Sequence, residues 1–132
     1  MNKIKTLNVC IAGLGTVGSS VINSLIKNQQ FIIQKINTEF KIQAISAKNK
    51  SKKRIFDINN FQWKDDPFEL VKNTNCDIFI ELIGYEKGLS FDLVKKALEN
   101  KFHVITANKA MLSKYGNELF KIAEENNVLL LF

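Results

Sequence analysis

The stretch that decides the fold is LNVCIAGLGTVG at residues 7–18, where a short apolar run leads directly into a Gly-x-Gly-x-x-Gly pattern. An apolar run of this length that ends in glycine is typical of a buried strand. Apolar residues then recur at helical spacing over residues 16–28. A strand, a glycine-rich turn and a helix in this order form the context in which the pattern binds the pyrophosphate of a dinucleotide.

Each position of the glycine-rich turn has its own expected task. Gly13 would permit the tight turn, Gly15 would let a pyrophosphate approach the backbone, and Gly18 would bring the helix close to the strand. The amides of Gly15, Thr16 and Val17 would donate to the pyrophosphate, helped by the helix dipole. A glycine-rich turn without a ligand is the alternative, and we disfavour it because three glycines at this spacing lower stability without a compensating role.

Further along the chain, short apolar runs alternate with longer amphipathic ones. Besides the strand that ends at Ala12, strands are expected at residues 40–47, 77–83, 102–106 and 128–132. Helices are expected at residues 16–28 with a continuation to 36, at 68–73, at 90–100 and at 111–126. This alternation predicts an α/β fold, a Rossmann-like doubly wound parallel sheet with helices on both faces, in a single domain over residues 1–132.

Length and composition agree with one packed domain. The 132 residues are 45% hydrophobic, which suits a packed core and is too apolar for a disordered chain. No apolar window of about eighteen residues occurs, which argues against a membrane span. The basic residues 1–6 are not followed by the apolar run of a secretory signal, so we expect a cytoplasmic protein.

The cysteines and the histidine give no sign of a metal site. Cys10 and Cys76 lie far apart in separate apolar runs without a CxxC pattern, and His103 is the only histidine. We therefore expect no zinc site, two buried reduced thiols and a structural role for His103.

A basic loop, SAKNKSKKR at residues 46–54, follows the second expected strand. Sites that prefer NAD usually carry an Asp or Glu there to hold the adenosine ribose. This loop has no acid, and five of its residues 48–54 are Lys or Arg. We therefore predict that NADP(H) is preferred over NAD(H), with Lys48 and Lys50 as the contacts of the 2′-phosphate. A solvated basic loop is the alternative; nucleic-acid binding is disfavoured because no aromatic residues are interleaved.

Two further strand ends carry residues that suit a ligand, because open parallel sheets bind ligands at the carboxyl ends of their strands. Glu81 could orient loop amides or reach the cofactor ribose, but we favour a structural carboxylate at a loop; a carboxylate in an apolar strand is costly unless it is hydrogen-bonded. Gly84 would let the backbone approach the cofactor. The ammonium of Lys109 could hold a carboxylate or stabilise negative charge on a carbonyl oxygen, although position alone equally allows a surface lysine.

Five segments follow one another over nearly the whole chain: GLGTVG at 13–18, SAKNKSKKR at 46–54, DIFIELIG at 77–84, HVITANKAML at 103–112 and YGNEL at 115–119. Together they resemble the N-terminal NAD(P)-binding domain of homoserine dehydrogenase, of the monofunctional type. The specific part is TANKA after a strand with ELIG upstream. The resemblance implies an oxidoreductase that interconverts L-homoserine and L-aspartate 4-semialdehyde with NAD(P), on the route to threonine, methionine and isoleucine.

The resemblance also implies roles for individual residues. Those near the cofactor or the substrate are Thr16, Val17, Lys48, Gly84, Thr106 and Lys109. Thr16 and Val17 would bind the pyrophosphate, and Lys48 would lie near the adenosine ribose. Gly84, Thr106 and Lys109 would lie near the nicotinamide and the substrate. We expect Lys109 to act in catalysis by positioning and electrostatics, because hydride chemistry belongs to the cofactor. The family usually has a second glycine where this chain has Tyr85, which could crowd the nicotinamide ribose.

The family continues beyond the position of Phe132 with a substrate loop and a dimerising substrate domain that holds the main catalytic lysine and aspartate and a monovalent-cation site. By resemblance, we expect a chain that binds the dinucleotide but hardly reduces a semialdehyde alone. The small-molecule substrate would need the missing domain, and the full enzyme would be a homo-oligomer. No room for an upstream aspartate kinase module is expected before Met1, and no nucleic-acid or membrane partner is expected.

Two other functions stay open. A stand-alone NAD(P)-sensing regulatory module would fit the length, but such modules usually carry an acid after the second strand and have no need of TANKA. The nucleotide-binding half of another amino-acid dehydrogenase is the second alternative.

Overall fold

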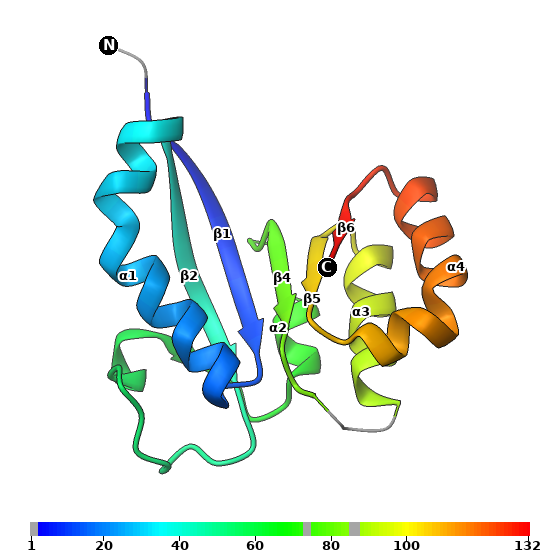
Figure 1. The fold of residues 1–132 in the computed structure, drawn as a ribbon, viewed down its shortest axis with the longest axis horizontal. Helices are drawn as coiled ribbons and strands as arrows, with labels where there is room; N and C mark the ends of the chain where they lie inside the picture. Colours follow the sequence, from blue (N-terminus) through cyan, green and yellow to red (C-terminus); the bar gives the residue numbers. More distant parts are fainter. Residues whose placement is uncertain (1–2, 73–74, 85–87) are drawn as a thin grey trace.

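The computed structural model describes residues 3–72, 75–84 and 88–132. They form a six-stranded parallel sheet in the order β3-β2-β1-β4-β5-β6 (Figure 1). The strands are β1 (Lys5–Ala12), β2 (Thr38–Ser46), β3 (Gln62–Trp63), β4 (Ile78–Glu81), β5 (His103–Thr106) and β6 (Leu130–Leu131). The helices are α1 (Thr16–Ile36), α2 (Phe68–Lys72), α3 (Leu89–Glu99) and α4 (Lys109–Glu125), with a 3₁₀ turn, η1 (Ile58–Asn60).

The chain starts in the middle of this sheet and builds it in two directions. From β1 it runs outward through β2 to β3, and then returns to the other side of β1 to lay down β4, β5 and β6. The strand order therefore reverses between β1 and β4, the place where open α/β sheets bind their ligands. The doubly wound, Rossmann-like fold expected from the alternating pattern is confirmed.

Alternate side chains of the central strands supply two separate cores. Val9 and Ile11 of β1 point to the face covered by α1, where they pack with Ile22. Cys10 and Ala12 point to the opposite face, whose core includes buried side chains of α2, α3 and α4. Both faces of β1 are thus buried, which explains why its sequence is a continuous apolar run and does not alternate.

The observed boundaries agree with the expected ones in part. The first helix continues to Ile36 as expected, and Asn37 ends it in the left-handed conformation with φ 52°. The strand β3 and the turn η1 were missed, because a strand of two residues is too short to produce a periodic pattern. The last strand is shorter than expected, Leu130–Leu131. Residue 73 of the helix expected at residues 68–73 lies outside the described residues.

The expectation of two reduced thiols is wrong. Cys10 and Cys76 form a disulfide, with their Cα atoms 6.4 Å apart and a sequence separation of 66. Cys76 lies just before β4, and the amide of Asp77 donates to the carbonyl oxygen of Asn8 on β1. This parallel pairing brings the two side chains together on one face, which no spacing in the sequence reveals.

Among the residues that the structure describes, no helix combines the length and the apolar character needed to cross a bilayer.

Candidate functional site

The glycine-rich turn connects β1 to α1 at the reversal of strand order. Gly13 has φ +97°, and a Cβ atom there would lie 2.8 Å from the amide nitrogen of Ile83. A Cβ atom on Gly18 would collide with the carbonyl oxygen of Gly13 and lie 2.8 Å from its carbonyl carbon. Gly13 therefore makes the turn and Gly18 allows the close packing of α1 against it, as the pattern predicted.

Gly15 differs from these two glycines, because a Cβ atom there would have no heavy atom within 4 Å. Gly15 is also the N-cap of α1, and no side chain caps this end of the helix. The first turn carries no acidic residue, and the Val17 side chain is 57% exposed. A long helix thus presents its first amides and the positive end of its dipole to open space, an arrangement that suits an anion.

A cavity of about 540 Å³ adjoins the turn at the carboxyl ends of β1, β2 and β4. The side chains and backbone that line it include Gly13, Gly15, Ser46, Lys48, Arg54 and Ile83. A second cavity of about 430 Å³ lies beside the first turn of α1, lined by Thr16, Ser19, Lys53 and others. The two cavities share Gly15, Lys52 and Arg54, so together they form one cleft that follows the glycine-rich turn and the basic loop.

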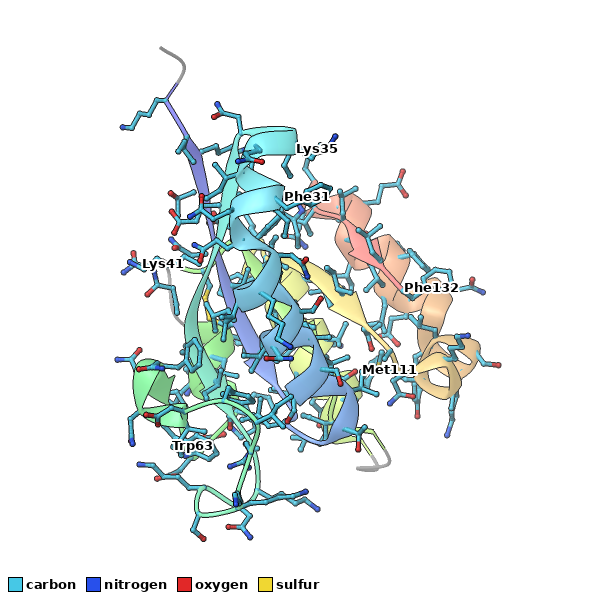
Figure 2. All side chains as sticks on the ribbon, turned by 60° about the vertical axis from the view of Figure 1, so that its left-hand side comes forward. Phe31, Lys35, Lys41, Trp63, Met111 and Phe132 are labelled. Atoms are coloured by element: carbon cyan, nitrogen blue, oxygen red, sulfur yellow. A yellow bond between two sulfur atoms is a disulfide. The ribbon has the colours of Figure 1, made fainter. Side chains whose placement is uncertain are left out.

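The basic loop is organised by Arg54. Its Nη1 donates to the carbonyl oxygens of Lys50 and Lys52 at 3.3 and 3.1 Å, and Nη2 donates to that of Asn49. The guanidinium carbon lies 5.6 Å from the centre of the Trp63 ring, which comes from β3 beside the loop (Figure 2). Arg54 thus holds the loop in a defined shape while also lining the cleft.

The lysines of the loop have different positions. Lys48 lines the larger cavity and Lys52 lines both. Lys50, which the sequence favoured, lines neither; its ammonium lies 6.0 Å from the centre of the Trp63 ring. Asp65 is an acid of the cleft that the sequence analysis missed, and its carboxylate accepts a hydrogen bond from Trp63 Nε1 at 2.9 Å. Side-chain directions in a loop without periodicity are not readable from sequence, so Lys52, Arg54 and Asp65 went unselected.

Glu81 ends β4 and is fully buried. Its Oε1 accepts hydrogen bonds from the amide of Ile83 and the hydroxyl of Ser90, both at 2.9 Å. Its Oε2 accepts one from the hydroxyl of Thr106 at 2.6 Å. These bonds lie within the fold, which agrees with the favoured expectation of a structural carboxylate, and three donors offset the cost of burying it.

Thr106 passes this network on to the next strand end. It is 1% exposed, and its Oγ1 accepts a hydrogen bond from the amide of Asn108 at 3.1 Å. The Asn108 side chain caps α4 by accepting from the amide of Met111, which Figure 2 labels at the start of that helix, and donates to the carbonyl oxygen of Gly84 at 3.3 Å. The Thr106 side chain is therefore buried against Glu81 and is not exposed to the cleft. It would affect a bound ligand only through the residues that it positions.

Gly84 and Lys109 lie at the same edge of the sheet but outside the two cavities. Gly84 has φ +85°, with open space where a Cβ atom would be. Lys109 is the first residue of α4 and is exposed. Tyr85 lies outside the described residues. His103 has the structural role expected of it, because its Nδ1 accepts a hydrogen bond from the amide of Leu129 at 3.0 Å.

A comparison with known protein families identifies the family of the domain that contains this cleft. The family model described as the NAD-binding domain of homoserine dehydrogenase matches residues 13–132, which include the glycine-rich turn, the basic loop, Glu81 and Lys109. The chain belongs to the homoserine dehydrogenase NAD-binding domain family. This membership agrees with the resemblance drawn from the five segments, and it supports a nicotinamide dinucleotide as the cofactor.

Homoserine dehydrogenases are also the chain's relatives among characterised sequences. It is 37% identical over 129 residues to the homoserine dehydrogenase of Neisseria gonorrhoeae and 36% identical over 129 residues to that of Pseudomonas aeruginosa. Each alignment covers 98% of this chain but 29% of the relative. The chain thus spans less than a third of the length of these homoserine dehydrogenases.

Solved structures of homoserine dehydrogenases share the fold. The enzyme from S. aureus, crystallised at pH 6.5, superposes with a TM-score of 0.89 at 39% identity, over 97% of this chain and 32% of that one. The enzyme from Thiobacillus denitrificans gives a TM-score of 0.88 at 31% identity, over 100% of this chain and 30% of that one. An archaeal homoserine dehydrogenase mutant in complex with NADPH shares the fold, with a TM-score of 0.75 at 21% identity.

Proposed function

We propose that this chain is the cofactor-binding domain of a homoserine dehydrogenase, which interconverts L-homoserine and L-aspartate 4-semialdehyde with a nicotinamide dinucleotide. The observation that carries the proposal is the open space at Gly15, where uncapped helix amides face a basic cleft at the reversal of strand order. Family membership favours this function over a stand-alone NAD(P)-sensing module or another amino-acid dehydrogenase.

The residues of the cleft fit a dinucleotide in a specific way. The amides of Gly15, Thr16 and Val17 would hold the pyrophosphate, because the N-cap residue Gly15 has no side chain that could accept their hydrogen bonds. Gly18 would serve the cofactor indirectly, by keeping α1 close to the turn. The bound dinucleotide supplies the hydride chemistry, and the chain orients it.

We further propose that NADP(H) binds more tightly than NAD(H). The carboxyl end of β2 carries Ser46 and then Ala47 and Lys48, so no acid stands where one would repel a 2′-phosphate. Lys48 and Lys52 line the cleft, and Arg54 gives the loop its shape. These cations outnumber the Asp65 carboxylate, which is engaged by Trp63.

Calorimetric titration of the chain with NADPH and with NADH tests both proposals. We expect NADPH to bind about tenfold more tightly, because two or more ammonium groups contact its additional phosphate. Lys48→Ala and Lys52→Ala each reduce this difference, and so does rising salt, because exposed charge pairs are screened. Lys41→Ala on β2, exposed and outside the cleft, is the matched control. Equal affinities contradict the NADP(H) preference, and failure to bind either dinucleotide contradicts the cofactor-binding function.

In the complete enzyme, we propose that Lys109 positions the substrate and stabilises developing negative charge, as its exposed place at the strand-end edge allows. Substrate binding, oligomer formation and turnover would depend on the further residues that the longer relatives have. A cytoplasmic location stays a prediction.

A further inference from the structure

The side-chain network of Glu81 joins two segments that the proposed function uses separately. On one side it binds the amide of Ile83, whose neighbour Leu82 packs its carbonyl group against Gly13. Leu82 and Ile83 both line the larger cavity. One oxygen of the carboxylate thus helps to set the wall of the cleft next to the glycine-rich turn.

On the other side the carboxylate acts through Thr106. The strands β4 and β5 lie side by side in the sheet (Figure 1), and Glu81 and Thr106 are partners in their register. Their side chains therefore leave the same face of the sheet. The hydroxyl of Thr106 donates its proton to Glu81 Oε2, and one of its two lone pairs accepts a hydrogen bond from the backbone amide of Asn108. This one hydroxyl group therefore links the carboxylate of Glu81 to the backbone of Asn108.

Asn108 is the residue that this chain of hydrogen bonds finally places. Its backbone amide donates to the hydroxyl of Thr106, and its side-chain oxygen caps α4 by accepting from the amide of Met111. Its side-chain nitrogen donates to the carbonyl oxygen of Gly84. The next residue, Lys109, begins α4. The position of the Lys109 backbone therefore depends on the same carboxylate that orients Ile83.

We infer that Glu81 is a positioning residue, a buried carboxylate that aligns the nicotinamide-side segment 106–109 with the cleft wall at Leu82 and Ile83. The inference rests on the proposed function, because it takes the cleft to hold a dinucleotide and the segment 106–109 to face its nicotinamide end. Glu81 acts through Thr106 and Ile83 and does not touch the cofactor itself.

The test uses two ligands of different reach. NADPH spans both ends of the proposed site, whereas adenosine 2′,5′-bisphosphate carries only the adenosine end. Thr106→Val keeps the shape of the side chain but removes the hydroxyl that links Glu81 to Asn108. We expect this variant to bind NADPH about tenfold more weakly and adenosine 2′,5′-bisphosphate within about twofold of the unaltered chain.

Three further variants separate positioning from stability alone. Thr106→Ser restores the hydroxyl and is expected to restore NADPH affinity. Glu81→Met keeps most of the side-chain volume but offers no acceptor to the Thr106 hydroxyl, and it is expected to weaken NADPH binding as Thr106→Val does. Ser90→Ala also removes a buried hydrogen bond to Glu81, but from α3, and is expected to leave the affinity for both ligands unchanged.

The outcomes are distinct. Unchanged NADPH affinity in folded Thr106→Val overturns the inference, and so does an equal loss for both ligands, which marks a purely structural role. If Thr106→Val does not fold, the comparison of Glu81→Met with Ser90→Ala decides in the same way. If the unaltered chain binds neither ligand, the proposed function fails and not the positioning role.

Discussion

Gly15 and Gly18 are three residues apart, yet the space around them differs completely. Gly18 lies against the backbone of Gly13, which cannot swing aside as a flexible side chain can. Gly15 faces the open cleft with φ −74°, a value that any residue adopts. The fold therefore needs glycine at position 18. At position 15 the fold itself does not need glycine, but the proposed pyrophosphate would.

This difference predicts opposite effects for two alanine substitutions. Gly18→Ala is expected to lower the free energy of unfolding by about 2 kcal/mol or more, because the added methyl group overpacks the turn. Gly15→Ala is expected to change that free energy by less than about 1 kcal/mol while weakening NADPH binding by about tenfold or more, since the methyl group takes the place of the pyrophosphate. Urea unfolding and calorimetry measure the two effects.

Gly116→Ala on α4 is the matched control for this pair. Its added Cβ atom would lie 3.8 Å from Phe120 Cε2, an ordinary contact, and alanine is the better helix former. This variant is expected to keep both stability and NADPH affinity. A Gly15→Ala chain that binds NADPH as tightly as the unaltered one would contradict the assignment of the pyrophosphate site.

Among the elements, β1 lies at the reversal of strand order, between β2 and β4. It pairs with β2 along its whole length and with β4 from Val9 to Ala12, and the disulfide from Cys10 ties it to the segment just before β4. The disulfide lies in the core on the face of the sheet that α3 covers. It joins β1 to the segment before β4, the two strands between which the strand order reverses. Reducing it therefore releases a constraint between the elements that frame the cleft.

The stabilisation expected from this bond follows from the 66-residue separation of its cysteines. In the chain-entropy model a loop of this length stabilises the folded state by about 4 kcal/mol. Adding a reductant is expected to lower the urea midpoint of the chain, whereas the double variant Cys10→Ala, Cys76→Ala should show a lower midpoint that no longer responds to reductant. A midpoint of the unaltered chain that is indifferent to reductant would show that the bond does not stabilise the fold.

Elements with long apolar patterns were predictable and short or irregular ones were not. The helix over residues 16–36 and the strands at the centre of the sheet follow from periodicity, because burial on one or both faces repeats over many residues. The two-residue strand β3 follows from pairing with Ala44 and Ile45 of β2, a long-range contact with no local signal. The disulfide was missed for the same reason.

Over the whole molecule, the site combines predictable backbone with unpredictable side-chain directions. The glycine-rich turn was located from sequence because its glycines meet steric demands at fixed spacing. The basic loop was also found, but the choice of Lys48 and Lys50 over Lys52 and Arg54 depended on directions that only the folded loop defines. The Glu81 network spans three elements, so the sequence predicted the need for partners and not which partners.

The arrangement of the molecule supports the proposal that the amides at the start of α1 hold the pyrophosphate of a nicotinamide dinucleotide. The most direct test is an NMR titration of the ¹⁵N-labelled chain with NADPH. The amide signals of Gly15, Thr16 and Val17 are expected to shift progressively and saturate, whereas those at the far end of α1, at Ile36 and Asn37, are expected to stay in place. Saturating NADPH that leaves the first three signals unmoved would contradict the proposal.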